Sequence, residues 1–253
     1  MQPRPTALLW DVDGTLAETE LDGHRLAFNR AFSEVGLPWR WDVGLYLDLL
    51  RISGGRERIA AFLEQTEGHR PSPDRLDALQ AAKQRHYRDL VDQGEIGLRP
   101  GVRRLMEAAA AAGLEQGIVT TSGRSAVQSL LERQLPHHPE LLSFWICGDD
   151  VGAKKPDPEA YQLALNRLDR PAAEVLAIED SGNGLQAACG AGLAVLITRS
   201  ASSLHEPLED LARAAAVVDG LGEPDHPCGV LCGPACPEGL VTLSYLQRLL
   251  SPS

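Results

Sequence analysis

Short apolar runs that alternate with helical patterns constrain the fold of this chain more than any other sequence feature. Each run is four or five residues long, and the stretches between runs carry apolar residues at helical spacing. Alternation of this kind is typical of a parallel sheet with helices on both faces. The predicted strands are residues 7–10, 117–120, 144–147, 175–178, 194–198 and 215–218, and the helices between them are residues 125–133, 159–168 and 184–191.

A purely helical segment interrupts this alternation after the first strand. Apolar residues recur at three- and four-residue intervals in residues 26–35, 43–50, 58–65 and 76–91, and no strand pattern lies among them. We therefore predict an α/β fold, with a parallel Rossmann-like sheet and an inserted all-helical domain. The core comprises residues 1–19 and 98–253, and the insertion comprises residues 20–97. Two narrow connections, near residues 16–19 and 98–101, suggest that the insertion moves as a lid.

The charge of the chain limits its partners. The 253 residues include 24 Lys and Arg against 35 Asp and Glu, a net charge of −11. Nucleic acids and anionic lipids require a basic surface, so we expect neither as a partner. An anionic substrate has to be drawn in by local positive charge or by a bound cation. We find no membrane-spanning stretch and no targeting signal at the N-terminus, and we expect a cytoplasmic monomer.

The chain has five cysteines, a small and odd number that does not indicate a disulfide framework. The only cluster is Cys228, Cys232 and Cys236, with His226 nearby. Their spacing matches none of the common zinc patterns, so we interpret the segment as a loop with free thiols. Residues 221–237 receive no functional role from the sequence.

Polar side chains follow four of the predicted strands, where each strand ends. In parallel α/β sheets these ends share one edge, which is where ligands bind. Taken singly, the groups have ordinary interpretations as turns, exposed lysines or acidic helix starts. Their occurrence at successive strand ends favours a site. The groups are Asp11-Val12-Asp13-Gly14-Thr15, Thr120-Thr121-Ser122, Lys154-Lys155-Pro156, and Glu179-Asp180 followed by Ser181-Gly182-Asn183-Gly184.

These residue types favour phosphoryl transfer. Close carboxylates repel one another, so Asp11, Glu179 and Asp180 together call for a hard cation such as Mg²⁺. A carboxylate can attack phosphorus and form a phosphoaspartate, while a lysine and hydroxyls hold the phosphoryl oxygens. A second carboxyl two residues along, Asp13, lies on the same side of an extended segment and can exchange protons with the leaving oxygen and with water.

The four groups resemble the four motifs of the haloacid dehalogenase-like hydrolase superfamily, and the helical insertion resembles its small α-helical cap. The resemblance implies that Asp11 is the nucleophile and Asp13 the general acid and base. It implies a Mg²⁺ site formed by Asp11, the backbone carbonyl of Asp13, and Asp180, with Glu179 close by. Phosphoryl binding would fall to Thr120 and Lys155, helped by Thr121 and Ser122; Lys155 is preferred to Lys154 because the family's lysine directly precedes the proline.

Single residues separate the activities within this superfamily. Asp13 argues against a dehalogenase, which has no leaving oxygen to protonate. Phosphonate hydrolysis uses a Schiff-base lysine from the cap, and the candidate Lys83 is expected on a solvated helix face. Hydrolysis of a phosphate ester and phosphoryl shuttling in a mutase both remain.

The cap sequence is similar to the CbbY-type branch, whose members are sugar-phosphate phosphatases, the best understood acting on xylulose 1,5-bisphosphate. The similarity lies in residues 17–20, 24–25, 27–29, 39–41 and 52–59. It implies substrate contacts from Glu20, Tyr46, Arg56, His24 and Arg58, with an arginine at 56 where many relatives have lysine.

The residues of the cap allow a second phosphate to bind. Gly54-Gly55-Arg56, at the start of a helix, offers backbone N–H groups and a guanidinium, although a plain helix–helix turn is an equal interpretation. For Arg58 a surface ion pair is the expected role.

We expect a Mg²⁺-dependent phosphatase that hydrolyses a small phosphorylated sugar. Xylulose 1,5-bisphosphate is the first expected substrate. The alternatives are a sugar phosphomutase of the β-phosphoglucomutase type, which shares the motifs, and a binding module without activity.

Overall fold

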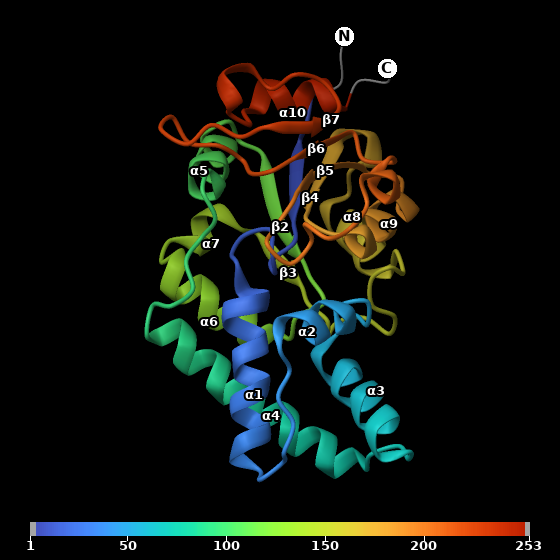
Figure 1. Ribbon diagram of the computed structural model, residues 1–253. Coiled ribbons are helices and arrows are strands. Elements are labelled where there is room, and N and C mark those ends of the chain that lie inside the picture. Colours follow the sequence, from blue (N-terminus) through green and yellow to red (C-terminus); the bar gives the residue numbers. More distant parts are fainter. Residues whose placement is uncertain (1–3, 251–253) are drawn as a thin grey trace.

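The computed structural model describes residues 4–250, so the ends of the expected core range, residues 1–3 and 251–253, lie outside the described residues. Within it, seven strands form one sheet in the order β3-β2-β1-β4-β5-β6-β7 (Figure 1). All neighbours are parallel except β6 and β7. The α/β prediction is confirmed. The strands are β1 Ala7–Trp10, β2 Glu115–Val119, β3 Phe144–Ile146, β4 Val175–Glu179, β5 Ala194–Thr198, β6 Ala216–Val218 and β7 Val230–Cys232.

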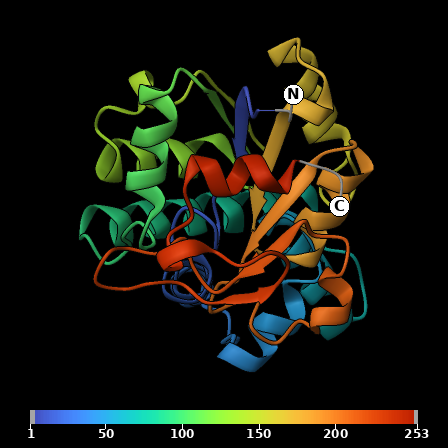
Figure 2. The same ribbon diagram turned by 90° about the horizontal axis from the view of Figure 1, so that it is seen from above.

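Helices cover both faces of the sheet because its central strands are apolar on both sides. In β1, Leu8 and Trp10 pack into one hydrophobic cluster, and Ala7 and Leu9 pack into the other. Helices α5 (Val102–Ala111), α6 (Arg124–Gln134) and α10 (Leu243–Leu249) contribute to the first cluster, and α8 (Glu159–Leu168) and α9 (Gly182–Gly190) to the second. Figure 2 shows these layers from above. Short turns α7 (His138–Leu141), η2 (Ala172–Glu174), η3 (Leu208–Leu211) and η4 (Pro237–Gly239) connect them.

A helical block lies between β1 and β2 and faces the sheet edge where β1 and β4 end (Figure 1). It contains η1, a π-helix (Glu20–His24), and the helices α1 (Arg25–Glu34), α2 (Val43–Leu49), α3 (Gly55–Glu67) and α4 (Pro73–Asp92). Ser72 caps α4 by accepting a hydrogen bond from the Arg75 backbone N–H, with Pro73 in the first turn. No strand lies in residues 20–97, all of which the structure describes.

The helical block has a hydrophobic core of its own. Aromatic residues dominate it, and Trp41 packs between Phe32 and Phe62 at ring-centroid distances of 5.0 and 5.2 Å. The second half of α4 packs differently, because Tyr87, Leu90 and Val91 belong to the cluster of the sheet. One end of α4 therefore ties the block to the α/β unit.

The segment after β6 departs from the sequence-based expectation. It adds β7 as an antiparallel edge strand and then α10, neither of which the sequence predicted. Gly and Pro surround the three residues of β7, so no strand-length apolar run marks it. None of the helices within residues 4–250 combines the length and apolar character that a bilayer crossing requires.

Candidate active site

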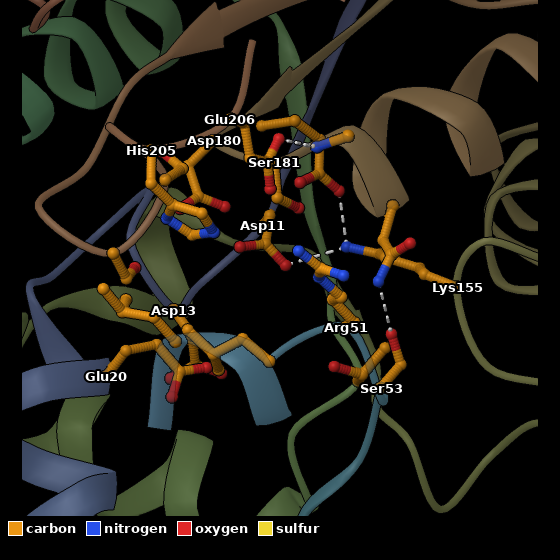
Figure 3. A pocket seen from close by; sticks show the side chains of 18 of the residues that line it. Asp11, Asp13, Glu20, Arg51, Ser53, Lys155, Asp180, Ser181, His205 and Glu206 are labelled. Atoms are coloured by element: carbon orange, nitrogen blue, oxygen red, sulfur yellow. Dashed lines mark hydrogen bonds and ion pairs between the residues drawn. The ribbon is translucent and has the colours of Figure 1, made fainter. Parts of the chain in front are cut away.

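The strand ends bring the predicted motif residues together at one edge of the sheet (Figure 3). Asp11 follows β1, and its backbone N–H donates to the Ile178 carbonyl of β4, 3.0 Å away. Glu179 ends β4, and Asp180 follows it. Carboxylate oxygens of Asp11, Glu179 and Asp180 lie within 4.8 Å of one another, and all three side chains are buried. They line a cavity of about 600 Å³ between the sheet and the helical block.

Lys155 is the cation at the centre of this cluster. Its Nζ donates to Asp11 Oδ1 at 2.8 Å, to Glu179 Oε1 at 2.5 Å and to the Val119 carbonyl at 2.7 Å. Burial alone disfavours the ammonium, but the charges of Asp11 and Glu179 outweigh burial and raise the pKa of Lys155. Glu179 also accepts a hydrogen bond from the Tyr161 hydroxyl at 2.5 Å. Glu179 thus holds Lys155 against Asp11.

One lysine does not neutralise three buried carboxylates. Burial, followed by the charge of Glu179, raises the pKa of Asp11 to about 8. Burial and the charge of Asp11 raise the pKa of Asp180 well above its usual value, although Ser200 Oγ donates to Asp180 Oδ2 at 2.6 Å. Crowded carboxylates with raised pKa values are the environment that a divalent cation relieves. The donor set, all oxygen, fits Mg²⁺.

The backbone leaves room for this crowding at Gly14. Its φ is +84°, a conformation that favours glycine, and a Cβ placed there would lie 2.1 Å from Asp180 Oδ2. Only glycine lets the loop after β1 approach the Asp180 carboxylate this closely. The Gly of the Asp13-Gly14 pair is therefore required by the site and not by a turn alone.

Asp13 lies next to the triad but has different surroundings. Its carboxylate accepts hydrogen bonds from Thr19 Oγ1 at 2.5 Å, from Ser122 Oγ at 2.5 Å and from His24 Nε2 at 2.9 Å. Burial opposes ionisation of Asp13, but the contact with His24 and the hydrogen bonds from Ser122 and Thr19 hold its pKa well below the usual value. Asp11 and Asp13, two residues apart, are thus shifted in opposite directions.

Lys83 is buried, not solvated as the sequence suggested. Its Nζ lies 2.9 Å from His24 Nδ1, and the His24 ring stacks on Tyr87 with centroids 4.3 Å apart. Burial lowers the pKa of Lys83 to about 8. Asp13 and Lys83 therefore contact opposite nitrogens of the same His24 ring. The expectation that Lys83 lies on a solvated face was wrong because α4 turns this position toward the site.

The residues expected to bind the phosphoryl group lie in different surroundings. Thr121 lines the cavity. Thr120 is buried beneath it, and its hydroxyl accepts a hydrogen bond from the Ser122 backbone N–H at 3.1 Å. The Ser122 hydroxyl donates a hydrogen bond to Asp13. In this arrangement Ser122 therefore binds a carboxylate, although it was expected to help bind the phosphoryl group.

The sequence of the site and its fold match one family of known proteins. The pattern of haloacid dehalogenase-like hydrolases matches residues 5–192, which include Asp11, Asp13, Thr120, Lys155, Glu179 and Asp180. The chain belongs to the haloacid dehalogenase-like hydrolase family. Membership makes it a hydrolase, and its similarity to CbbY proteins supports a phosphatase.

Relatives of this hydrolase include several CbbY proteins. CbbY of Cereibacter sphaeroides is 41% identical over 218 residues, which cover 86% of this chain and 93% of the relative. CbbY of Cupriavidus necator is 41% identical over 227 residues, covering 87% of both chains. A crystallised CbbY variant from Rhodobacter sphaeroides, in complex with xylulose 1,5-bisphosphate, is 39% identical with a TM-score of 0.80, covering 87% of this chain and 96% of that chain. The resemblance stated from the motifs is confirmed.

On the helical block of this hydrolase, Glu20, Tyr46 and Arg58 form a hydrogen-bonded chain. Tyr46 donates its hydroxyl to Glu20, and Arg58 Nη1 donates to the Tyr46 hydroxyl at 3.2 Å. Glu20 and Arg58 line the cavity, whereas Tyr46 is fully buried behind them. Tyr46 thus positions its two neighbours instead of lining the site.

Arg58 does not form the surface ion pair expected from the sequence. It is 6% exposed, and its Nε donates to the Leu49 carbonyl at 3.1 Å. Among the described residues, no acceptor is found for Nη2. The expectation was wrong because Arg58 lies one helical turn before Phe62, on the buried face of α3.

A smaller cavity of about 150 Å³ continues from the first, and the two share Asp13, Glu20, Arg58 and Thr121. Gly54, Gly55 and Arg56, at the start of α3, line only this smaller cavity, as do His24 and Lys83. Arg56 is exposed and donates to Asp77 Oδ1 at 2.8 Å. Arg58 therefore borders both cavities, whereas Arg56 borders only the smaller one.

Sequence reasoning missed several residues of the site. Ser200 follows β5, so the strand-end argument would have found it. Lys83 lies 59 positions from His24, and no local pattern marks it. Three more side chains enter the cavity from loops: Arg51, Ser53 and His205 (Figure 3).

Proposed function

We propose that this phosphatase hydrolyses a small sugar phosphate with Mg²⁺ and through a phosphoaspartate on Asp11. The observation that carries the proposal is the pairing of two differently shifted carboxyls, Asp11 and Asp13, beside the buried Lys155. A nucleophile and a proton-transfer group are needed at one phosphorus, and these two residues meet both needs.

Each residue then has a task. Asp11 Oδ2 attacks phosphorus, because Oδ1 is held by Lys155. Lys155 and the backbone N–H groups near Thr121 offset the charge of the phosphoryl oxygens. Asp11, the Asp13 carbonyl and Asp180 would hold Mg²⁺, with Glu179 close by, and the bound ion would supply further positive charge at the phosphoryl group.

Asp13 exchanges the protons. Its three donors stabilise the ionised form, which accepts a proton from the water that attacks the phosphoaspartate. To deliver a proton to the leaving oxygen, Asp13 must itself be protonated. The protonated form is favoured when one of the three hydrogen-bond donors moves away from the Asp13 carboxylate. Since His24 lies on the helical block whereas Thr19 and Ser122 lie on the α/β unit, movement between the two would switch these states. We therefore propose that residues 20–97 act as a cap that moves against residues 1–19 and 98–253.

Replacing Lys83 with methionine is expected to lower kcat about 10- to 100-fold with a smaller change in KM. The substitution removes the positive charge that, through His24, holds Asp13. Arg85→Met on the same helix is the control, because Arg85 is exposed and pairs with Glu34. Steady-state kinetics of both variants test this prediction. If Lys83→Met and Arg85→Met had equal kcat values, Lys83 would have no positioning role.

We further propose xylulose 1,5-bisphosphate as the substrate. The joined cavities would accept a ligand with a phosphate at each end, and cations lie along both: Lys155 in the first, and Arg58 between them. A CbbY protein 39% identical to this chain was crystallised with that bisphosphate. We place the enzyme in the cytoplasm, since all five cysteines are free thiols.

A phosphate-release assay tests this function. Purified enzyme with Mg²⁺ should release inorganic phosphate from xylulose 1,5-bisphosphate faster than from sugar monophosphates, and a chelator should abolish release until Mg²⁺ is restored. Conversion of glucose 1-phosphate to glucose 6-phosphate without net release would instead identify a mutase. Absence of release from every sugar phosphate offered would contradict a phosphatase.

Replacing Arg58 with methionine is expected to raise KM for the bisphosphate about 10- to 100-fold, with a smaller effect on monophosphates. The buried Arg58 lines both cavities, no acceptor is found for its Nη2 among the described residues, and methionine fills similar space without charge. Arg58→Lys should recover part of the loss, and Arg56→Met should change KM less because Arg56 is exposed. Equal losses on both substrate classes would show that Arg58 only supports the cap.

A further inference from the structure

The segment that joins β6 to α10 has no part in the proposed function and lies beyond the matched family pattern, which ends at residue 192. It carries three of the five cysteines. Cys232 is exposed on β7, at the edge of the sheet. Cys228 and Cys236 are half-buried and pack against the same hydrophobic cluster of the sheet. Two of the three thiols thus face inward together.

The backbone brings Cys228 and Cys236 to one glycine. The Cys228 N–H donates to the Gly239 carbonyl at 2.8 Å, and the Gly239 N–H donates to the Cys236 carbonyl at 3.2 Å. The hydroxyl of Tyr245 and the guanidinium of Arg248, both on α10, donate to the Pro234 and Ala235 carbonyls. The chain between the two cysteines is therefore held as a closed loop against α10.

Each of the two thiols affects the pKa of the other. Burial, then the charge of Cys236 and a hydrogen bond with it, raises the pKa of Cys228 to about 11. Burial raises the pKa of Cys236 as well, but the hydrogen bond from Cys228 and the charges of Arg248 and Arg104 work against burial. Both thiols border Tyr245, whose pKa is raised by burial and by their charges. Cys236 is thus the thiol whose ionised form its neighbours support.

We propose that Cys228 and Cys236 form a reversible disulfide. The oxidant is a low-molecular-weight disulfide such as oxidised glutathione. The Cys236 thiolate attacks one of its sulfurs, which breaks that S–S bond, forms a mixed disulfide and releases one thiol. The Cys228 thiolate then attacks Cys236 Sγ, which forms the internal S–S bond and releases the second thiol. The two protons lost by the cysteines end on the two released thiols.

The disulfide would covalently close the loop of residues 228–236, which lies beside both connections to the helical block. A separate cavity of about 370 Å³ is lined by His226 and Cys228 from the loop and by Glu18 and Leu98 from the connections. Arg104 of α5 donates to the Leu221 and Gly222 carbonyls just before the loop. Closing the loop covalently should raise the unfolding temperature by about 5 °C.

Oxidation of the full-length protein tests the proposal. Protein carrying Cys232→Ser is incubated with oxidised glutathione at about pH 8.5, near the ordinary pKa of a free thiol. Because no Lys or Arg lies between Arg213 and Arg248, trypsin leaves residues 214–248 on one peptide. We expect this peptide to lose two hydrogens, to resist alkylation, and to regain both thiols with dithiothreitol.

Single variants assign the pairing and its order. Cys228→Ser should stop at a glutathione adduct on Cys236, whereas Cys236→Ser should form an adduct much more slowly; alanine serves at either position if serine unfolds the loop. The wild type should pair the same two cysteines as the Cys232→Ser protein. Retention of two alkylatable thiols at 228 and 236 after oxidation, or pairing that requires Cys232, would overturn the proposal.

Discussion

Replacing Asp11 with asparagine is expected to lower phosphate release by at least about 10⁴-fold while the fold persists. Asparagine keeps the shape of the side chain but removes the attacking oxygen. Lys155 retains its contact with Glu179, so no buried cation is left without a partner. Phosphate release and thermal unfolding of the same preparation are the measurements.

The pH dependence of stability provides a second readout for Asp11→Asn. The pKa of Asp11 is raised from 3.8 to about 8 in the folded chain, so the folded state binds a proton that the unfolded state has released between these values. In the metal-free protein this contribution to the free energy of unfolding is present at acid pH and is lost as the pH rises toward 8. The variant should lack that loss. Substantial activity in the variant would contradict a covalent route through Asp11.

Replacing Lys155 with methionine is expected to lower the free energy of unfolding by about 3–5 kcal/mol and kcat by about 10²- to 10³-fold. The substitution leaves Asp11 and Glu179 buried without their shared cation. Because the pKa of Asp11 is raised by burial, Asp11 can take up a proton at lower pH, and the deficit should shrink between about pH 8 and pH 5. Denaturant unfolding at both pH values measures it.

Lys154 provides the matched control. Its Nζ pairs with Glu57 of α3 at 2.8 Å, and this pair is partly exposed, at 23% and 48% of the two side chains. Lys154→Met should therefore change the free energy of unfolding by about 0–1 kcal/mol. If Lys154→Met destabilised the protein as much as Lys155→Met, the central role given to Lys155 would be wrong.

Much of the fold was predictable because its strands are short, apolar and sharply ended. The predicted ranges for β1, β5 and α8 agree with the structure residue for residue, and the four long helices of the insertion were all found. The signals fail after β6, where β7 has only three residues among Gly and Pro. A strand this short exists because β6 offers an unpaired edge, which is a tertiary property.

The candidate site likewise has features that the local sequence predicts and features that depend on tertiary structure. The sequence by itself determined which chemistry stands at the strand ends, since a parallel sheet brings Asp11, Lys155 and Asp180 to one edge whatever the details of packing. Only the tertiary structure decided what lies against Asp13, and that Lys83 and Arg58 are buried. Those contacts join residues far apart in the chain or turn on the rotation of a helix, and local spacing encodes neither.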